Sequence, residues 1–192
     1  MLASSSPRRR VLLADHGFTF TVAPADVDER LQPGEAPHEA ASRLAIEKAL
    51  VTRTRVGDDS VILAADTCVV CSGEILGKPA DFDDALRMLA MLSGRNHRVV
   101  TCWAVLPADA PAERGATGAS VSTVRMREIS RREAIAYASG PEPYDKAGAY
   151  AVQGDARRFI AAVIGPLDNV VGLPVAPVRA ALARFGITPG DR

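Results

Sequence analysis

The sequence of 192 residues has no apolar stretch of about 18 residues, the shortest that would span a membrane as a helix. It has no excess of either charge, because 23 Lys and Arg balance 23 Asp and Glu. A dedicated nucleic-acid binder usually carries a basic excess, so the composition argues against that class. No apolar segment follows the charged N-terminus, so no secretory signal is expected. We therefore expect a cytoplasmic protein that binds neither nucleic acid nor membrane.

Cysteine and histidine are also scarce, with three of each: Cys68, Cys71 and Cys102, and His16, His38 and His97. A small, odd number of cysteines favours reduced thiols in a cytosol over a disulfide framework. Cys68 and Cys71 lie within TCVVCSG, which is typical of a strand entering a turn, whereas a redox pair places its first Cys at a helix N-terminus. We expect buried structural thiols there. The histidines are too far apart in the sequence to suggest a zinc site.

The chain is long enough for one generous domain or two small lobes, and for a substantial core. Hydrophobic periodicity and capping residues predict helices over 7–17, 38–56, 81–94, 130–140 and 175–186. Alternating or continuous apolar runs predict strands over 1–4, 18–24, 60–70, 97–107 and 120–129. The segment 107–120, rich in Pro, Gly and Ala, is expected to be a long hairpin loop. Helices and strands alternate without a strict βαβ order, which indicates an α/β fold with a mixed sheet.

The segment SSSPRRR places Arg8, Arg9 and Arg10 in the first turn of the first predicted helix. A helix N-terminus favours anions, so cations there are unfavourable for the helix alone. An anionic phosphate ligand would offset that cost, because arginine binds phosphate through two parallel hydrogen bonds. The alternative is a solvated basic turn. The segment contains no GxxxxGK[ST] motif, so it is not a P-loop.

Three further residues are unusual in their positions. Asp66 interrupts the apolar run VILAADTCVV, and a buried carboxylate must be paired, bound to metal or functional. Lys48 lies on the apolar face of the helix predicted over 38–56. Lys78 follows a turn in LGKP. Each has an ordinary explanation: a strand-end carboxylate that reaches solvent, a lysine whose ammonium extends to the surface, and a surface lysine. Together they describe a site with cations for phosphate and a carboxylate for a metal ion or a water.

Several motifs resemble the Maf family of nucleoside triphosphate pyrophosphatases. They occur in the family's order over nearly the whole chain: ASSSPRR at 3–9, Glu29 after an acidic loop, EKA at 47–49, AADT at 64–67, LGKP at 76–79, YDKAGAYAVQG at 144–154 and VVGLPV at 170–175. The resemblance implies a single domain over 1–192. It implies an elongated, twisted mixed sheet flanked by helices and a cleft between two lobes. It also implies a cytosolic homodimer that cleaves a nucleoside triphosphate between the α and β phosphates.

The resemblance also implies roles for individual residues. Asp66 would be the catalytic base, and the other catalytic positions would be Glu29, Lys48 and Lys78. Ser4, Arg8 and Arg9 would bind substrate. Arg8, Thr67 and Gln153 match the pattern of the dTTP/UTP branch of the family and not that of the 7-methyl-GTP branch. Met1 stands only three residues before Ser4, so the first strand is expected to be truncated or the start site to be misplaced.

Oxygen ligands such as Asp66 and Glu29 suit a hard divalent cation, Mg²⁺ or alternatively Mn²⁺. Phosphoanhydride hydrolysis depends mainly on positioning and on neutralising charge, which fits the cations of this chain. Whether Asp66 accepts a proton from water or mainly holds the metal stays open at this point. A second hypothesis also stays open, that the chain is a non-catalytic nucleotide-binding regulator of septum formation or cell division.

Overall fold

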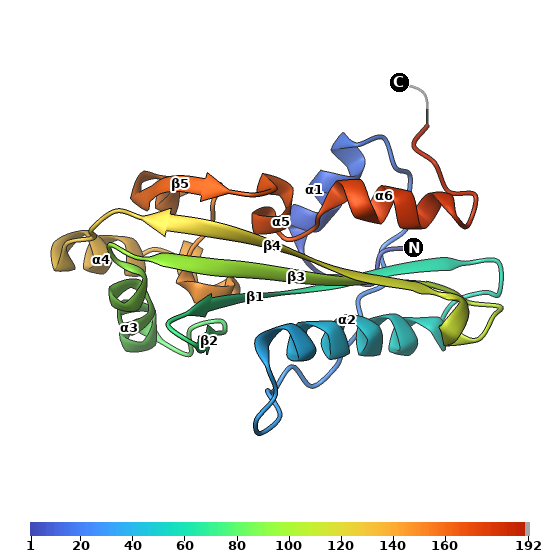
Figure 1. The fold of residues 1–192 in the computed structure, drawn as a ribbon, viewed down its shortest axis with the longest axis horizontal. Coiled ribbons are helices and arrows are strands. Elements are labelled where there is room, and N and C mark those ends of the chain that lie inside the picture. The colour runs from blue at the N-terminus through green and yellow to red at the C-terminus, as the bar shows by residue number, and fades with distance from the viewer. Residues whose placement is uncertain (191–192) are drawn as a thin grey trace. The chain divides into compact units, whose positions relative to one another are not determined.

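The computed structural model describes residues 1–190, which fold into an α/β arrangement of strands and helices (Figure 1). The helices are α1 (Pro7–Asp15), α2 (Pro37–Arg53), α3 (Phe82–Leu92), α4 (Arg131–Ala138), α5 (Leu167–Val171) and α6 (Val175–Ala183). The strands are β1 (Val61–Cys71), β2 (Glu74–Leu76), β3 (Asn96–Pro107), β4 (Ala116–Met126) and β5 (Ile160–Ile164). Short 3-10 helices are η1 (Ala112–Arg114), η2 (Glu142–Asp145), η3 (Ala147–Ala149) and η4 (Asp155–Phe159). The predicted α/β class is confirmed.

The strands form one sheet in the order β2-β1-β3-β4-β5. Strands β1 and β2 pair antiparallel, as do β4 and β5, whereas Leu2 makes parallel bridges to Val22 and Leu63. Both strand directions therefore occur, as the sequence predicted. The β1–β2 hairpin turns at Ser72 and Gly73, with φ of 52° and 85°. A two-residue turn with both φ positive matches the right-handed twist of the paired strands.

The chain divides into two compact units. The first comprises Met1–Asp66, Thr101–Ser120 and the chain from Gly172 onward, and the second comprises Thr67–Val100 and Val121–Val171. Strands β1, β3 and β4 each contribute residues to both units. The single domain with two lobes expected from the resemblance stays a prediction. Within residues 1–190, none of the helices combines the length and the apolar character that crossing a membrane would require.

The first unit has apolar side chains on both faces of its part of the sheet. One cluster contains Ile62 and Ala64 of β1 with Ala49 of α2. The other contains Leu63 and Ala65 of β1 with residues of α1 and α6, including Leu13, Val178 and Leu182. Successive side chains of a strand point to opposite faces, so even-numbered residues of β1 face α2 and odd-numbered residues face α1 and α6. Figure 1 shows the same three layers.

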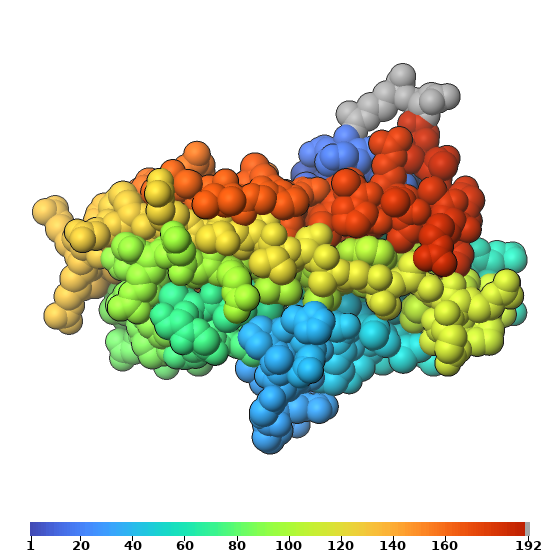
Figure 2. Space-filling view, viewed as in Figure 1, coloured from blue at the N-terminus to red at the C-terminus, as the bar shows by residue number. Residues whose placement is uncertain are grey.

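Helix α2 buries the side that its periodicity predicted. Its buried residues recur at helical spacing: Ala41, Leu44, Ala45, Lys48, Ala49 and Thr52. The other side of α2, blue to cyan in Figure 2, forms part of the molecular surface. Lys48 therefore lies on the apolar face of its helix, as expected, with only 7% of its surface exposed.

Aromatic side chains pack together in the interior of the second unit. Phe159 is fully buried, and the Tyr137 ring meets it edge-on at 5.5 Å between centroids. Helix α3 begins at Asp81, whose side chain accepts from the Asp84 amide, and helix α4 begins with the predicted capping box of Ser130 and Glu133. Cys68 and Cys71 are buried free thiols, as predicted, and Cys102 of the first unit is a buried free thiol as well.

Two predicted strands were wrong in extent. The segments 1–4 and 18–24 each form only a bridge, at Leu2 and Val22. Leu2 donates to the Thr21 carbonyl at 2.8 Å, and Ala3 donates to that of Leu63 at 2.8 Å. The pairing ends there because the chain turns into α1 at Pro7. The loop predicted over 107–120 is also shorter, since β4 already begins at Ala116.

His97 provides a prediction about stability at acidic pH. It is 2% exposed in β3, its Nε2 lies 2.6 Å from Tyr150 Oη, and burial lowers its pKa to about 4. An unfolded histidine titrates near pH 6.5, so between about pH 6.5 and 4 only the unfolded chain takes up this proton. Stability is therefore lost as pH falls through that window. His97→Gln, which keeps a polar partner for Tyr150, should lose about 2 kcal/mol less free energy of unfolding than wild type between about pH 7 and 5.

Urea titrations at several pH values measure this difference. The matched control is His16→Gln, because His16 is exposed and its Nδ1 lies 2.8 Å from the Leu12 carbonyl of the neighbouring helix turn. It should keep the wild-type pH dependence. Parallel stability curves for wild type and His97→Gln would contradict the assignment to His97.

Candidate functional site

The first unit brings two carboxylates to one buried ammonium. Lys48 Nζ lies 2.6 Å from Asp66 Oδ1 and 2.7 Å from Glu29 Oε1. The exposed fraction of the side chain is 9% for Lys48, 16% for Asp66 and 45% for Glu29. Asp66 is thus the shielded partner of the lysine and Glu29 the partner open to solvent.

Local sequence explains why these groups meet. Asp66 continues the even-numbered series Ile62 and Ala64 of β1, whose side chains face α2. Lys48 lies one residue before Ala49, the α2 residue that packs on this face of the strand. The carboxylate that interrupts the apolar run and the lysine that interrupts the apolar helix face therefore neutralise each other. Each offsets the cost of burying the other.

The loop that carries Glu29 is held on α2 by Arg43. Its guanidinium donates to both Glu35 oxygens at 2.7 and 2.9 Å, to the Arg30 carbonyl at 3.2 Å and to Glu47 at 3.2 Å. The hydrogen bonds to Glu35 are the main cause that raises the pKa of Arg43. This scaffold was not predicted from the sequence. The spacing of Arg43 and Glu47, four residues apart on one helix, was its only signal.

Arg9 and Ser4 form a second buried polar group in the first unit. Arg9 Nε donates to the Gly172 carbonyl at 2.7 Å, and its Nη1 donates to Ser4 Oγ at 3.1 Å. Ser4 Oγ also accepts from the Ser6 amide at 3.2 Å. Burial lowers the pKa of Arg9, whereas the negative charges of Asp66 and Glu29 act in the opposite direction. Arg9 therefore connects the N-terminal segment to the segment before α6. The negative charges of Asp66 and Glu29 also act on its guanidinium.

Arg8 is half-buried beside Arg9, whereas Arg10 is exposed and donates to the Ser5 carbonyl at 2.9 Å. The three arginines thus differ in environment. Arg8 is the one that is partly shielded and partly accessible to solvent.

Cys102, in β3, lies near enough to Asp66 to feel its charge. Burial and then the Asp66 charge raise the pKa of the Cys102 thiol to about 11. It is therefore a neutral thiol at physiological pH.

Thr67, Lys78 and Gln153 belong to the second unit. Thr67 is half-buried and follows Asp66 in β1, while Lys78 is exposed after β2. The Gly148 amide donates to the Gly77 carbonyl at 2.9 Å, which joins the LGKP segment to the YDKAGAYAVQG segment. Gly148 has φ of 71°, and a Cβ there would lie 3.0 Å from Val69, so glycine is needed at this close approach.

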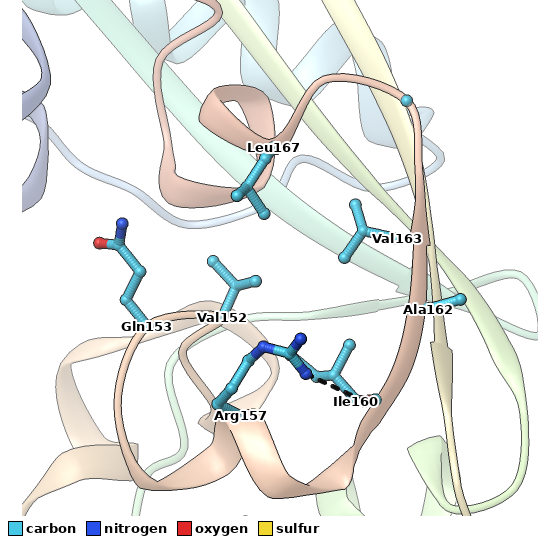
Figure 3. A pocket seen from close by; sticks show the side chains of 8 residues that line it. Val152, Gln153, Arg157, Ile160, Ala162, Val163 and Leu167 are labelled. Atoms are coloured by element: carbon cyan, nitrogen blue, oxygen red, sulfur yellow. Dashed lines mark hydrogen bonds between the residues drawn. The ribbon is translucent and has the colours of Figure 1, made fainter.

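Gln153 lies at a cavity of about 550 Å³ in the second unit. Apolar side chains of Val152, Val163 and Leu167 line it together with the longer side chain of Arg157 (Figure 3). Arg157 donates to the Ile160 carbonyl at 3.2 Å. A mostly apolar cavity with a few polar groups is typical of a small-molecule site.

The carboxylate pair fits a divalent cation that arrives with a ligand. Among residues 1–190, no group of three His, Cys, Asp or Glu side chains is placed to hold a metal ion. Glu29 and Asp66 nevertheless both reach one point, the Lys48 ammonium. Mg²⁺ is commonly bound through one or two carboxylates, with substrate phosphates and water completing its shell. The two carboxylates match that donor set.

The structure is thus an α/β protein in which one buried ammonium is shared by two carboxylates. The sequence profile described as Maf-like protein matches residues 1–185. The chain belongs to the Maf-like family. The family predicted from the motifs is therefore confirmed.

Similar proteins share nearly half of their aligned residues with this chain. A dTTP/UTP pyrophosphatase of Hahella chejuensis is 46% identical over 189 residues, which cover 97% of this chain and 92% of that protein. A dTTP/UTP pyrophosphatase of Anaeromyxobacter dehalogenans is 48% identical over 187 residues, which cover 97% of this chain and 93% of that protein. Among solved structures, a nucleoside-triphosphatase / dITP/XTP pyrophosphatase from Mycobacterium abscessus is 14% identical with a TM-score of 0.41, covering 96% of this chain and 95% of its own.

Proposed function

We propose that the protein is a nucleoside triphosphate pyrophosphatase that hydrolyses dTTP and UTP to the monophosphate and pyrophosphate. The observation that carries the proposal is the buried Lys48 ammonium shared by Asp66 and Glu29. The relatives named dTTP/UTP pyrophosphatase support it, because they match nearly the whole chain.

The residues divide into groups with different tasks. In the reaction, water attacks the α phosphorus. The bond between this phosphorus and the oxygen that bridges it to the β phosphate breaks, and pyrophosphate leaves with the negative charge on that oxygen. Asp66 is shielded and is proposed to orient this water and accept its proton. Lys48, Lys78 and Arg8 are proposed to neutralise the phosphates, because charge neutralisation dominates phosphoryl chemistry. Ser4 and Arg9, which bond each other, would hold the N-terminal segment against them.

Glu29 and Asp66 would hold the divalent cation, for which Mg²⁺ is proposed. When bound, such a cation supplies charge neutralisation at the phosphate oxygens. Lys48 contacts the same two carboxylates, so its ammonium draws them to one point and offsets their mutual repulsion.

Thr67 and Gln153 are proposed to recognise the pyrimidine. A glutamine amide has one acceptor and one donor group, and uracil and thymine present an edge of alternating acceptor, donor and acceptor. A site that pairs buried polar groups rejects a mismatched base, because unpaired groups are costly. Comparison of kcat/KM for dTTP, UTP, CTP and GTP tests this preference. Equal values for all four would refute it.

The central experiment is incubation of the pure protein with dTTP and Mg²⁺. The expected products are dTMP and pyrophosphate, and chelation of the metal should stop their formation. Asp66→Asn, purified in parallel, controls for contaminating phosphatases. Formation of dTDP and orthophosphate as first products would overturn the proposed bond choice. Tight dTTP binding without any product would favour the regulator hypothesis.

A cytoplasmic location and a homodimer are also proposed, both from the resemblance to the family. The three free thiols support a reducing compartment. Light scattering coupled to size exclusion measures the oligomeric state directly.

A further inference from the structure

The turn that carries Gln153 is held by a carboxylate from a different segment. Glu142, in η2, reaches the first amides of η4. Its Oε2 accepts from the Asp155 amide at 2.8 Å, and its Oε1 lies 3.4 Å from the Ala156 amide. These amides follow Gln153 by two and three residues. The carboxylate thereby satisfies donors that the start of a short helix leaves without intrahelical partners.

A buried tyrosine fixes the position of Glu142. Tyr137 Oη donates to Glu142 Oε1 at 3.0 Å, and the Tyr137 side chain is fixed by its edge-on contact with Phe159. Tyr137 is 4% exposed. Burial, followed by the Glu142 charge, raises the pKa of Tyr137, so its hydroxyl remains a donor over the physiological range. The carboxylate is therefore oriented from the core of the second unit.

Gly154 fits this carboxylate closely. Its φ is 131°, a value that side chains rarely adopt. A Cβ at this position would lie 2.7 Å from Glu142 Oε1 and 2.8 Å from Oε2. The backbone can approach the carboxylate only because residue 154 has no side chain. The glycine and the glutamate therefore act as a matched pair.

The same turn supplies part of the wall of the cavity shown in Figure 3. Val152 and Gln153 precede Gly154, and Arg157 follows it, and all three line the cavity. Gln153 itself is exposed on this turn. Its position is therefore set by the backbone of the turn, which Glu142 holds.

We propose that Glu142 is a positioning residue for substrate selection: it holds the Gln153–Arg157 turn so that Gln153 presents its amide to the pyrimidine edge. This inference rests on the proposed function. Glu142 acts through Gln153 and does not touch the reacting phosphates.

Glu142→Ala should raise KM for dTTP and lower kcat/KM about tenfold, with kcat changed less than about threefold. Glu142→Ala should also lower the ratio of kcat/KM for dTTP to kcat/KM for CTP, as Gln153→Ala should. Glu142→Gln should recover most of the preference, because its carbonyl can accept from the Asp155 amide while its amide donates to Tyr137 Oη. Hydrogen exchange of the amides in 153–156 should accelerate in Glu142→Ala.

Glu133→Ala is the matched control. Glu133 is also a carboxylate that caps a short helix in the second unit, with a side chain 37% exposed, and its bonds go to Ser130 and Arg127. It should lower the melting temperature without altering the dTTP/CTP preference or the exchange of 153–156. A wild-type preference and wild-type exchange in Glu142→Ala would overturn the positioning role alone. Absence of pyrophosphate release by the wild type would refute the proposed function, and the selective role of Glu142 with it.

Discussion

Asp66→Asn should lower kcat for dTTP by about a thousandfold, within the range observed when a positioned acid or base is removed. Asparagine has the same size, but its amide cannot accept the proton of an attacking water or bind a cation with a full negative charge. The fold should persist, because Lys48 keeps Glu29 as an ionic partner at 2.7 Å. Nucleotide binding should persist as well, since the cations proposed to neutralise the phosphates are unchanged.

Pyrophosphate release measures turnover, and thermal unfolding with nucleotide titration measures fold and binding. Asp28→Asn is the control, because Asp28 is an exposed carboxylate in the same unit, paired with Arg30. It should retain turnover within about twofold, as expected for a surface pair. Wild-type kcat in Asp66→Asn would show that the Lys48–Asp66 pair is structural only.

Local patterns in the sequence single out Asp66 and Lys48, the two residues that meet at the candidate site. A carboxylate in a run of β-type residues and a lysine on an apolar helix face are both anomalies that spacing alone reveals. Side chains repeat every two residues in β1 and every 3.6 residues in α2. These periods decide which face of the strand carries Asp66 and which face of the helix carries Lys48. That Asp66 and Lys48 contact each other follows once the helix packs on the even-numbered face of the strand.

Other parts could not be predicted, because they depend on contacts between distant segments. Glu142 and Gly154 are ordinary residues of loops, and only the folded chain shows a carboxylate in contact with a glycine backbone. Arg9 resembles a solvent-exposed cation in SSSPRRR, yet its guanidinium is buried on the Gly172 carbonyl, 163 residues away. The segments over 1–4 and 18–24 have strand-like composition, but their neighbours limit them to single bridges.

Lys48→Met should lower turnover at least about a hundredfold, because it removes both a phosphate-neutralising charge and the group that orients Asp66. Methionine approximates the length of the lysine stem, so packing of α2 is largely kept. The variant leaves Asp66 and Glu29 close together without their shared cation. Fully buried pairs cost about 3–5 kcal/mol to break, but Glu29 is 45% exposed. Solvent screening reduces the expected loss of unfolding free energy to about 1–3 kcal/mol.

The same variant separates the role of the lysine from that of the metal. Two carboxylates freed from an ammonium attract a divalent cation more strongly, so Lys48→Met should bind Mn²⁺ at least as tightly as wild type while turnover is lost. Electron paramagnetic resonance of free Mn²⁺ measures the affinity, and added Mn²⁺ should restore part of the thermal stability. Arg53→Met is the control, because it removes a different cation from α2, one that donates to the Ala108 carbonyl. It should change neither turnover nor metal affinity. Loss of Mn²⁺ binding in Lys48→Met would contradict the proposal that the two carboxylates hold the cation without help from the lysine.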